Sequence, residues 1–156
     1  MSRKRLFLLM QLDGNRYALD IDQIVEVLPL VSLNAVPRAP HGIAGMMDYG
    51  GVPVPVIDLS QLLVNRSAHR RLNTRLVIVH YRRGERHHLL GLIAERATEM
   101  MRRDPADFQD SGIDAASPPQ LGPVALDADG PVHRLEVGAL LPHELAESLF
   151  RQLVDA

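Results

Sequence analysis

The sequence contains no cysteine and no tryptophan, and only 4 % of its residues are aromatic. Without cysteine the chain can form no disulfide, no thiolate metal site and no cysteine nucleophile, and this composition fits a reducing compartment. So few aromatic rings provide no stacking platform for bases or sugars. These absences remove several classes of enzyme and argue against a nucleic-acid partner.

Long apolar runs are also missing. A basic start is followed by the apolar stretch Leu6 to Met10, which Gln11 and Asp13 bring to an end. A signal peptide needs a longer apolar core, and a membrane span needs about 20 apolar residues. The formal net charge of −2 gives no reason to expect a nucleic-acid partner. We therefore predict a cytoplasmic protein with no segment inserted into a membrane.

Short apolar stretches separated by turn signals take the place of long runs. The most informative stretch is Gly45 to Leu63, in which Asp48-Tyr49-Gly50-Gly51 predicts a tight hairpin turn, since glycine tolerates positive φ. Further strands are predicted at residues 6–12, 16–21, 24–28, 76–81, 89–94, 97–101, 123–126 and 132–137. Only Glu144 to Val154 carries an apolar stripe with helical spacing.

The pattern of strands repeats along the chain. An offset of 73 positions places Tyr17-Ala18-Leu19 on Leu90-Gly91-Leu92, and an offset of 78 places Ile57-Asp58-Leu59 on Leu135-Glu136-Val137. Each half then reads strand, glycine turn, strand, acidic-flanked strand, hairpin and a Leu-Leu pair. A five-stranded open sheet leaves its edges unpaired, and closing it into a small barrel removes them.

We therefore predict a mainly β fold with two five-stranded, SH3-like barrel subdomains related by a pseudo-twofold axis. Residues 5–64 form the first barrel, residues 74–141 the second, and residues 142–154 a C-terminal helix, within one domain spanning 5–154. The polar and basic segment 65–73 is predicted to be the linker.

No catalytic motif stands out. The sequence has no nucleophile elbow, P-loop, dinucleotide fingerprint or zinc-protease motif. His87 and His88 are adjacent on a predicted strand and point to opposite faces, and no histidine pairs with another at helical ligand spacing. We predict no catalytic residue, no metal and no cofactor.

An enzyme remains the alternative interpretation. It would be a small β-barrel protein that uses Asp20, Asp22 or Asp58 in a cleft, with a raised pKa on one carboxyl. The structural interpretation is that Asp20 and Asp22 are solvated strand ends or partner contacts and that Asp58 caps a turn.

The motifs, taken in order, resemble those of CheW-like coupling domains. They are YALDI at residues 17–21, IVEV at 24–27, PxAP at 37–40, GIAG at 42–45 and VPVPVIDL at 52–59. The match continues through Thr74, LVIV at 76–79, LGLI at 90–93 and the region of Glu99, so that it covers about residues 5 to 150.

This resemblance implies the two-barrel fold and an adaptor role without catalysis. The implied partners are the regulatory domain of a CheA-type histidine kinase and the cytoplasmic tip of a methyl-accepting-type receptor. Ile24 and Glu26 match the receptor-facing strand, and Asp48 and Gly50 lie at the neighbouring turn. We expect partly exposed aliphatic residues at one barrel end for the kinase contact. A regulatory fragment of a larger kinase is a further interpretation, which the initial Met and the terminal helix disfavour.

One departure from the family pattern bears on the receptor contact. The family has Asn-Leu-Arg-Gly before the proline-rich strand, whereas this chain has Asp48-Tyr49-Gly50-Gly51. The position of the family's arginine, implicated in receptor contact, is Gly50, which lacks the charge and the five donors of arginine. The departure suggests a specialised adaptor, such as one from a Wsp-type surface-signalling array.

Overall fold

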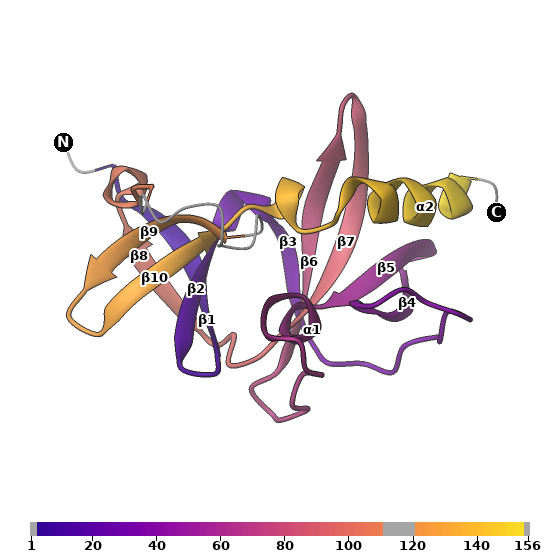
Figure 1. Ribbon diagram of the computed structural model, residues 1–156, viewed down its shortest axis with the longest axis horizontal. Coiled ribbons are helices and arrows are strands. Elements are labelled where there is room, and N and C mark those ends of the chain that lie inside the picture. Colours follow the sequence, from indigo (N-terminus) through magenta and orange to yellow (C-terminus); the bar gives the residue numbers. More distant parts are fainter. Residues whose placement is uncertain (1–2, 111–120, 155–156) are drawn as a thin grey trace.

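The computed structural model describes residues 3–110 and 121–154 (Figure 1). The strands are β1 (Arg5–Leu12), β2 (Asn15–Asp20), β3 (Ile24–Pro29), β4 (Ile43–Tyr49), β5 (Val52–Asp58), β6 (Arg75–Arg83), β7 (Arg86–Ala94), β8 (Glu99–Arg103), β9 (Leu121–Asp127) and β10 (Gly130–Leu135). The helices are α1 (Leu59–Val64) and α2 (His143–Val154), with 3₁₀ turns η1 (Ile21–Gln23), η2 (Pro105–Asp107) and η3 (Val137–Ala139). No strand or helix is predicted between residues 101 and 123, and within that segment residues 111–120 lie outside the described residues.

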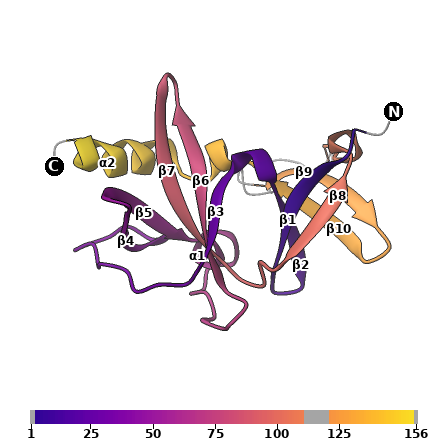
Figure 2. The same ribbon diagram turned by 180° about the vertical axis from the view of Figure 1, so that it is seen from behind.

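The strands form two five-stranded sheets that lie side by side (Figures 1 and 2). Sheet A has the strand order β8-β1-β2-β10-β9, and sheet B has the order β3-β6-β7-β5-β4. Helix α2 follows η3 and lies beside the projecting β6–β7 hairpin. The predicted fold class, mainly β with two five-stranded subdomains and a C-terminal helix, is confirmed.

Each sheet combines strands from both halves of the chain. Strands β1 and β2 of the first half join β8, β9 and β10 of the second half in sheet A, whereas β6 and β7 join β3, β4 and β5 in sheet B. The predicted subdomains 5–64 and 74–141 are therefore wrong. The repeat itself is present, because β1 to β5 follow the same course as β6 to β10 and the two halves exchange equivalent strands.

The exchange takes place at two short connections. After β2, the side chain of Asp20 accepts a hydrogen bond from the amide of Asp22 at 2.9 Å and starts the 3₁₀ turn η1, which leads into sheet B. After β7, Arg96 adopts a left-handed conformation (φ 51°), and the chain enters sheet A. The alternating apolar pattern specifies which face of a strand is buried, but it does not say which sheet receives the next strand.

The two halves meet through parallel strand pairs with equivalent register. In sheet B, β5 lies parallel to β7 with Val56 opposite Gly91, and in sheet A, β10 lies parallel to β2 with Arg134 opposite Ala18. The repeat offsets of 73 and 78 positions relate these two pairs. The sequence repeat is therefore a repeat of strand register as well as of strand order.

Each sheet curls toward a barrel without closing through a continuous ladder. Among the described residues no ladder joins β3 to β4 or β8 to β9. One isolated bridge takes its place in each sheet. Asn34 and Met46 exchange two backbone hydrogen bonds of 2.8 Å in sheet B, and Gln109 and Val124 exchange bonds of 2.9 and 2.8 Å in sheet A. The expectation of closed barrels is corrected to partly closed ones, since each gap is spanned by only one bridge, from the segment that follows β3 to β4 and from the segment that follows β8 to β9.

The core has three parts, and the strand pattern explains them. In β6, Leu76 and Ile78 pack into the small core inside sheet B, while the alternate residues Val77 and Val79 pack into the large core. Phe7 of β1 likewise packs inside sheet A. The large core collects side chains from both sheets and from α2, so β1 and β6 are buried on both faces and read as continuous apolar runs.

The helices cover ends of the large core. Phe150 of α2 stacks on Tyr81 and His88 of the β6–β7 hairpin, with ring centroids 5.2 and 4.2 Å apart. The short helix α1 was not predicted; it begins because the buried carboxylate of Asp58 accepts hydrogen bonds from the amides of Ser60 and Gln61. In the described part of the chain no helix has the length and apolarity needed to cross a membrane.

Candidate interaction surface on sheet B

The structure places the four predicted partner-binding residues at the two ends of sheet B. Ile24 and Glu26 lie on β3, and Asp48 and Gly50 lie at the end of β4 and in the turn that follows it. Glu26, Asp48 and Gly50 are exposed, whereas Ile24 is half-buried and packs against the large core. Because the sheet curls, β3 and β4 approach each other although they stand at opposite ends of the strand order.

A tyrosine joins the two parts of this site. The hydroxyl of Tyr49 donates a hydrogen bond of 2.6 Å to the Glu26 carboxylate. This bond raises the pKa of Tyr49 above its ordinary value, because ionisation of the phenol would remove the donor and place a second negative charge beside Glu26. Sequence reasoning missed Tyr49, which directly precedes the glycine at the family's arginine position. A hydroxyl near the missing arginine was the signal that could have found it.

Apolar side chains are exposed around Glu26. Val25 and Val27 flank it on β3, each about two-fifths exposed (39 % and 40 %), and Val31 follows the strand with a similar exposure. Val52, which is 49 % exposed, stands directly opposite Tyr49 in the β4–β5 pair. We call the group formed by Val25, Glu26, Val27, Val31, Tyr49 and Val52 the β3 surface.

A bulge and an edge position explain why three consecutive residues of β3 are exposed. The register with β6 shifts between Ile24 and Glu26, so Val25 is an extra residue without a partner of its own. β3 also stands at the edge of its sheet. A strand with one free edge and exposed valines is a ready-made docking site for another protein.

The turn beside the β3 surface is tightly specified. Gly50 and Gly51 have φ values of 58° and 89°, as a two-residue hairpin turn requires, and the Asp48 carboxylate accepts a hydrogen bond of 2.7 Å from the Gly51 amide. A Cβ added to Gly50 would meet no atom within 4 Å. There is room for the arginine that the family carries here, although the positive φ would strain any side chain.

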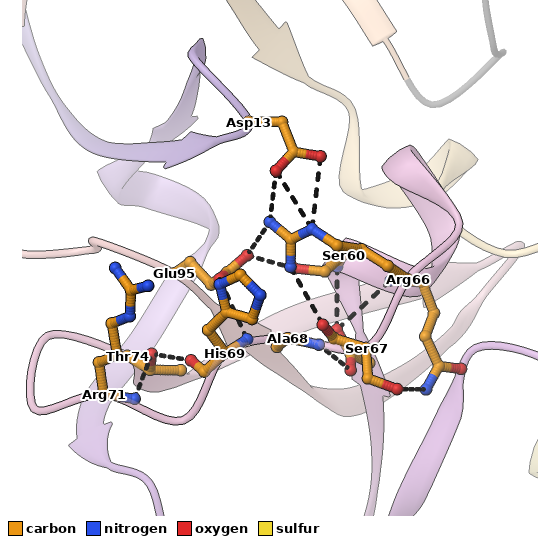
Figure 3. Close-up of polar contacts among 11 residues, drawn as sticks. Asp13, Ser60, Arg66, Ser67, Ala68, His69, Arg71, Thr74 and Glu95 are labelled. Atoms are coloured by element: carbon orange, nitrogen blue, oxygen red, sulfur yellow. Dashed lines mark hydrogen bonds and ion pairs between the residues drawn. The ribbon is translucent and has the colours of Figure 1, made fainter.

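The other polar cluster joins the two sheets and is structural (Figure 3). The buried carboxylate of Glu95 accepts hydrogen bonds from the Ser60 hydroxyl at 2.7 Å, from Arg66 Nη2 at 2.9 Å and from the His69 amide at 3.0 Å. Arg66 also donates to the carboxylate of Asp13 in the β1–β2 turn of sheet A, at 2.7 Å. Arg66 therefore bridges the end of β7 to the other sheet. We call this group the Arg66 cluster.

The three aspartates of the enzyme alternative also have ion-pair or hydrogen-bond partners within the protein. Asp20 is buried and binds Arg5 and Arg134 at 3.0 and 3.2 Å, and Asp22 pairs with Arg5 as well. Asp58 is buried in the other subdomain, where it caps α1 and also accepts a bond from the Ala68 amide at 2.9 Å. These carboxylates hold turns in place rather than converge on a substrate.

Comparison with known proteins decides the family. The family model described as "CheW-like domain" matches residues 6–145, which is most of the chain. The chain belongs to the CheW-like domain family. Among solved structures, the scaffolding protein TtCheW from Thermoanaerobacter tengcongensis matches with a TM-score of 0.79 and 22 % sequence identity, over 91 % of this chain and 90 % of that one. No curated protein matches the chain.

Membership of the CheW-like family assigns the chain to scaffold or adaptor proteins of chemotaxis-type signalling, which couple receptors to a CheA-type kinase and are not enzymes. The enzyme alternative is therefore unsupported. The sequence-based assignment to this family is confirmed, and the structure adds the β3 surface to the residues matched from the motifs.

Proposed function

We propose that this CheW-like chain binds the cytoplasmic tip of a methyl-accepting-type receptor through the β3 surface, and the regulatory domain of a CheA-type kinase through the far end of sheet A. The observation that carries the proposal is the exposed row Val25, Glu26, Val27 on an edge strand. The kinase contact rests on Leu126, which is 71 % exposed beside the β9–β10 turn, and on Met100, which is half-exposed. The chain would act on the cytoplasmic side of a receptor array, and a Wsp-type pathway remains our prediction for it.

Apolar exposure and a single carboxylate together favour a specific protein contact. A stable interface covers on the order of 800 Å² per partner, with an apolar centre and a polar rim. On the β3 surface the valines can supply the centre, while Glu26, held by Tyr49, supplies a fixed charge. Fixed charges at a rim set orientation and association rate more than total affinity.

Two charge-introducing variants test this assignment reciprocally. Val27→Asp should weaken binding to a receptor-tip fragment by at least about tenfold, because a buried unpaired carboxylate is costly at an interface, and should leave kinase binding unchanged. Leu126→Asp should do the opposite. Both residues are exposed, so both variants should fold as the wild type does. Binding of each variant to each partner by calorimetry gives four affinities, and equal losses for both partners would contradict the assignment.

Tyr49→Phe tests whether the phenol orients Glu26 for the receptor. Removing the hydroxyl frees the carboxylate to adopt several rotamers, and the lost pre-organisation should weaken receptor binding roughly threefold to tenfold. The melting temperature should not change, because the bond lies on the surface. In a double-mutant cycle, Tyr49→Phe should have no further effect once Glu26 is replaced by Ala. An undiminished effect in that background would mean that Tyr49 contacts the receptor directly.

A further inference from the structure

Two histidines come together on the β6–β7 hairpin, which projects from the body of the molecule (Figure 1). His80 Nδ1 and His87 Nε2 share a hydrogen bond of 2.7 Å, with ring centroids separated by 4.8 Å, and a bound ion would take the place of the shared proton. The two residues lie on neighbouring strands rather than on a helix, so their spacing of seven residues does not by itself bring them together. The hairpin register, with His80 opposite Leu89 and Arg82 opposite His87, makes them diagonal neighbours on one face.

The distance between the two nitrogens suits two neighbouring positions around one metal ion. Metal–imidazole bonds are about 2.0–2.1 Å long, so two such bonds at a right angle place their nitrogens about 2.9 Å apart, and at a tetrahedral angle about 3.3 Å apart. The observed distance of 2.7 Å is closer to the value for a right angle than to the value for a tetrahedral angle. Square-planar or octahedral nitrogen coordination is the preference of Cu²⁺ and Ni²⁺, whereas Zn²⁺ favours a tetrahedral arrangement.

We propose that His80 and His87 form a two-histidine site for a divalent late transition-metal ion, Cu²⁺ or Ni²⁺, with solvent in the remaining positions. In residues 3–110 and 121–154 no group of three or more histidine, aspartate or glutamate side chains is arranged around a metal, so the site has two protein ligands. A metal ion binds an imidazole nitrogen in its unprotonated form.

The neighbouring charges set the strength of this site. The cation of Arg82 stands directly opposite His87 on the same face and lowers the affinity for a metal ion. Asp22 and Glu136 line the same groove as His80 and Arg82, a space of about 400 Å³ between the two sheets. Arg134 lines this groove as well, and Asp22 is already paired with Arg5, so the carboxylates there offset the cations only in part. A bound ion would link β6 to β7 near this groove and stabilise the hairpin.

Titration of the untagged chain with NiCl₂ and with CuCl₂ at pH 7.5, followed by calorimetry and visible absorption, tests the site. We expect one ion per chain, bound more tightly for Cu²⁺ than for Ni²⁺, and no binding of Mg²⁺. His80→Asn and His87→Asn should each weaken binding at least tenfold. Arg82→Gln should strengthen it severalfold, since it removes a like charge.

Two controls keep the result specific. His41→Asn changes an exposed histidine whose ring nitrogen contacts the Gln61 carbonyl, far along the chain from the hairpin, and should leave metal binding unaltered. NiCl₂ should raise the melting temperature of the wild type but not of the His80→Asn/His87→Asn double variant. The proposal is overturned if the wild type binds neither ion at about 1 mM, or if the double variant binds as tightly as the wild type.

Discussion

Replacing Glu95 with Ala is expected to destabilise the chain by about 2–4 kcal/mol, a large part of the stability of a domain this size. The carboxylate satisfies three donors at once, from Ser60, Arg66 and the amide of His69. Without it the buried Ser60 hydroxyl and the partly buried His69 amide lose their acceptor, and desolvated donors without partners are costly. Chemical denaturation with two spectroscopic probes should give the change in unfolding free energy.

The same carboxylate should make stability depend on pH. Burial alone would raise the pKa of Glu95, but the hydrogen bonds from Ser60 and Arg66 outweigh it and hold the pKa below the ordinary value. A carboxyl with a lowered folded-state pKa stabilises the protein above its unfolded pKa of about 4.3, and this contribution is lost as the pH falls through the folded value. Below about pH 4.5, the wild type should therefore lose more stability than Glu95→Gln does.

Asp13→Ala is the matched control for Glu95. It removes the exposed carboxylate on the other side of Arg66 and leaves the three hydrogen bonds to Glu95 in place. Its effect on unfolding should be much smaller, because exposed ion pairs contribute little. If Asp13→Ala were as damaging as Glu95→Ala, the stabilisation would come from the link between the sheets rather than from burial of Glu95.

Gly45→Ala should also be strongly destabilising, by about 2–4 kcal/mol, and should disturb the β3 surface. Gly45 has a φ of 153°, and a Cβ there would lie 2.7 Å from the backbone oxygen of Asn34. Asn34 and Met46 form the isolated bridge between β4 and the segment that follows β3, so the backbone has to move where this bridge forms. We expect a lower melting temperature together with weaker receptor binding.

Gly14→Ala separates backbone strain from the steric clash. Gly14 also has a positive φ (82°), but a Cβ on it would meet nothing within 4 Å. This variant should lose only about 1 kcal/mol and should bind the receptor fragment normally. A Gly45→Ala variant as stable as Gly14→Ala would show that the Asn34 segment can move aside without cost.

The residues that define strands were predictable, whereas their partners in the sheets were not. The alternation in Val52, Val54 and Val56 and the glycines at the β4–β5 turn specify a hairpin, because these are local properties of the chain. The exchange of strands between the halves depends on the turn that Asp20 starts and on the left-handed Arg96, each a matter of a single residue's conformation. Sequence reasoning therefore found the repeat and assigned its parts to the wrong sheets.

In the candidate site, too, some features could be predicted from the sequence and others could not. Glu26 and the turn glycines follow from the motifs, but the bond from Tyr49 to Glu26 forms only because the sheet curls and brings β4 near β3. The pairing of His80 with His87 likewise follows from the hairpin register, which a search at helical spacing overlooks. Among the carboxylates considered for catalysis, Asp20 binds Arg134, which lies far away in the sequence, whereas Asp58 binds backbone amides that follow it closely in the chain.

The exchanged strands also bear on how such a chain could be divided. A polypeptide with only the first half would carry two strands of one sheet and three of the other, and would complete neither. Two fragments cut in the segment 65–73 would need each other to restore both sheets, and two copies of a half-length chain could complete each other in the same way, as in a domain-swapped dimer. The fold is thus an intramolecular version of a swapped dimer, in which Arg66 and His69 of the Arg66 cluster belong to the linker that makes the two halves one molecule.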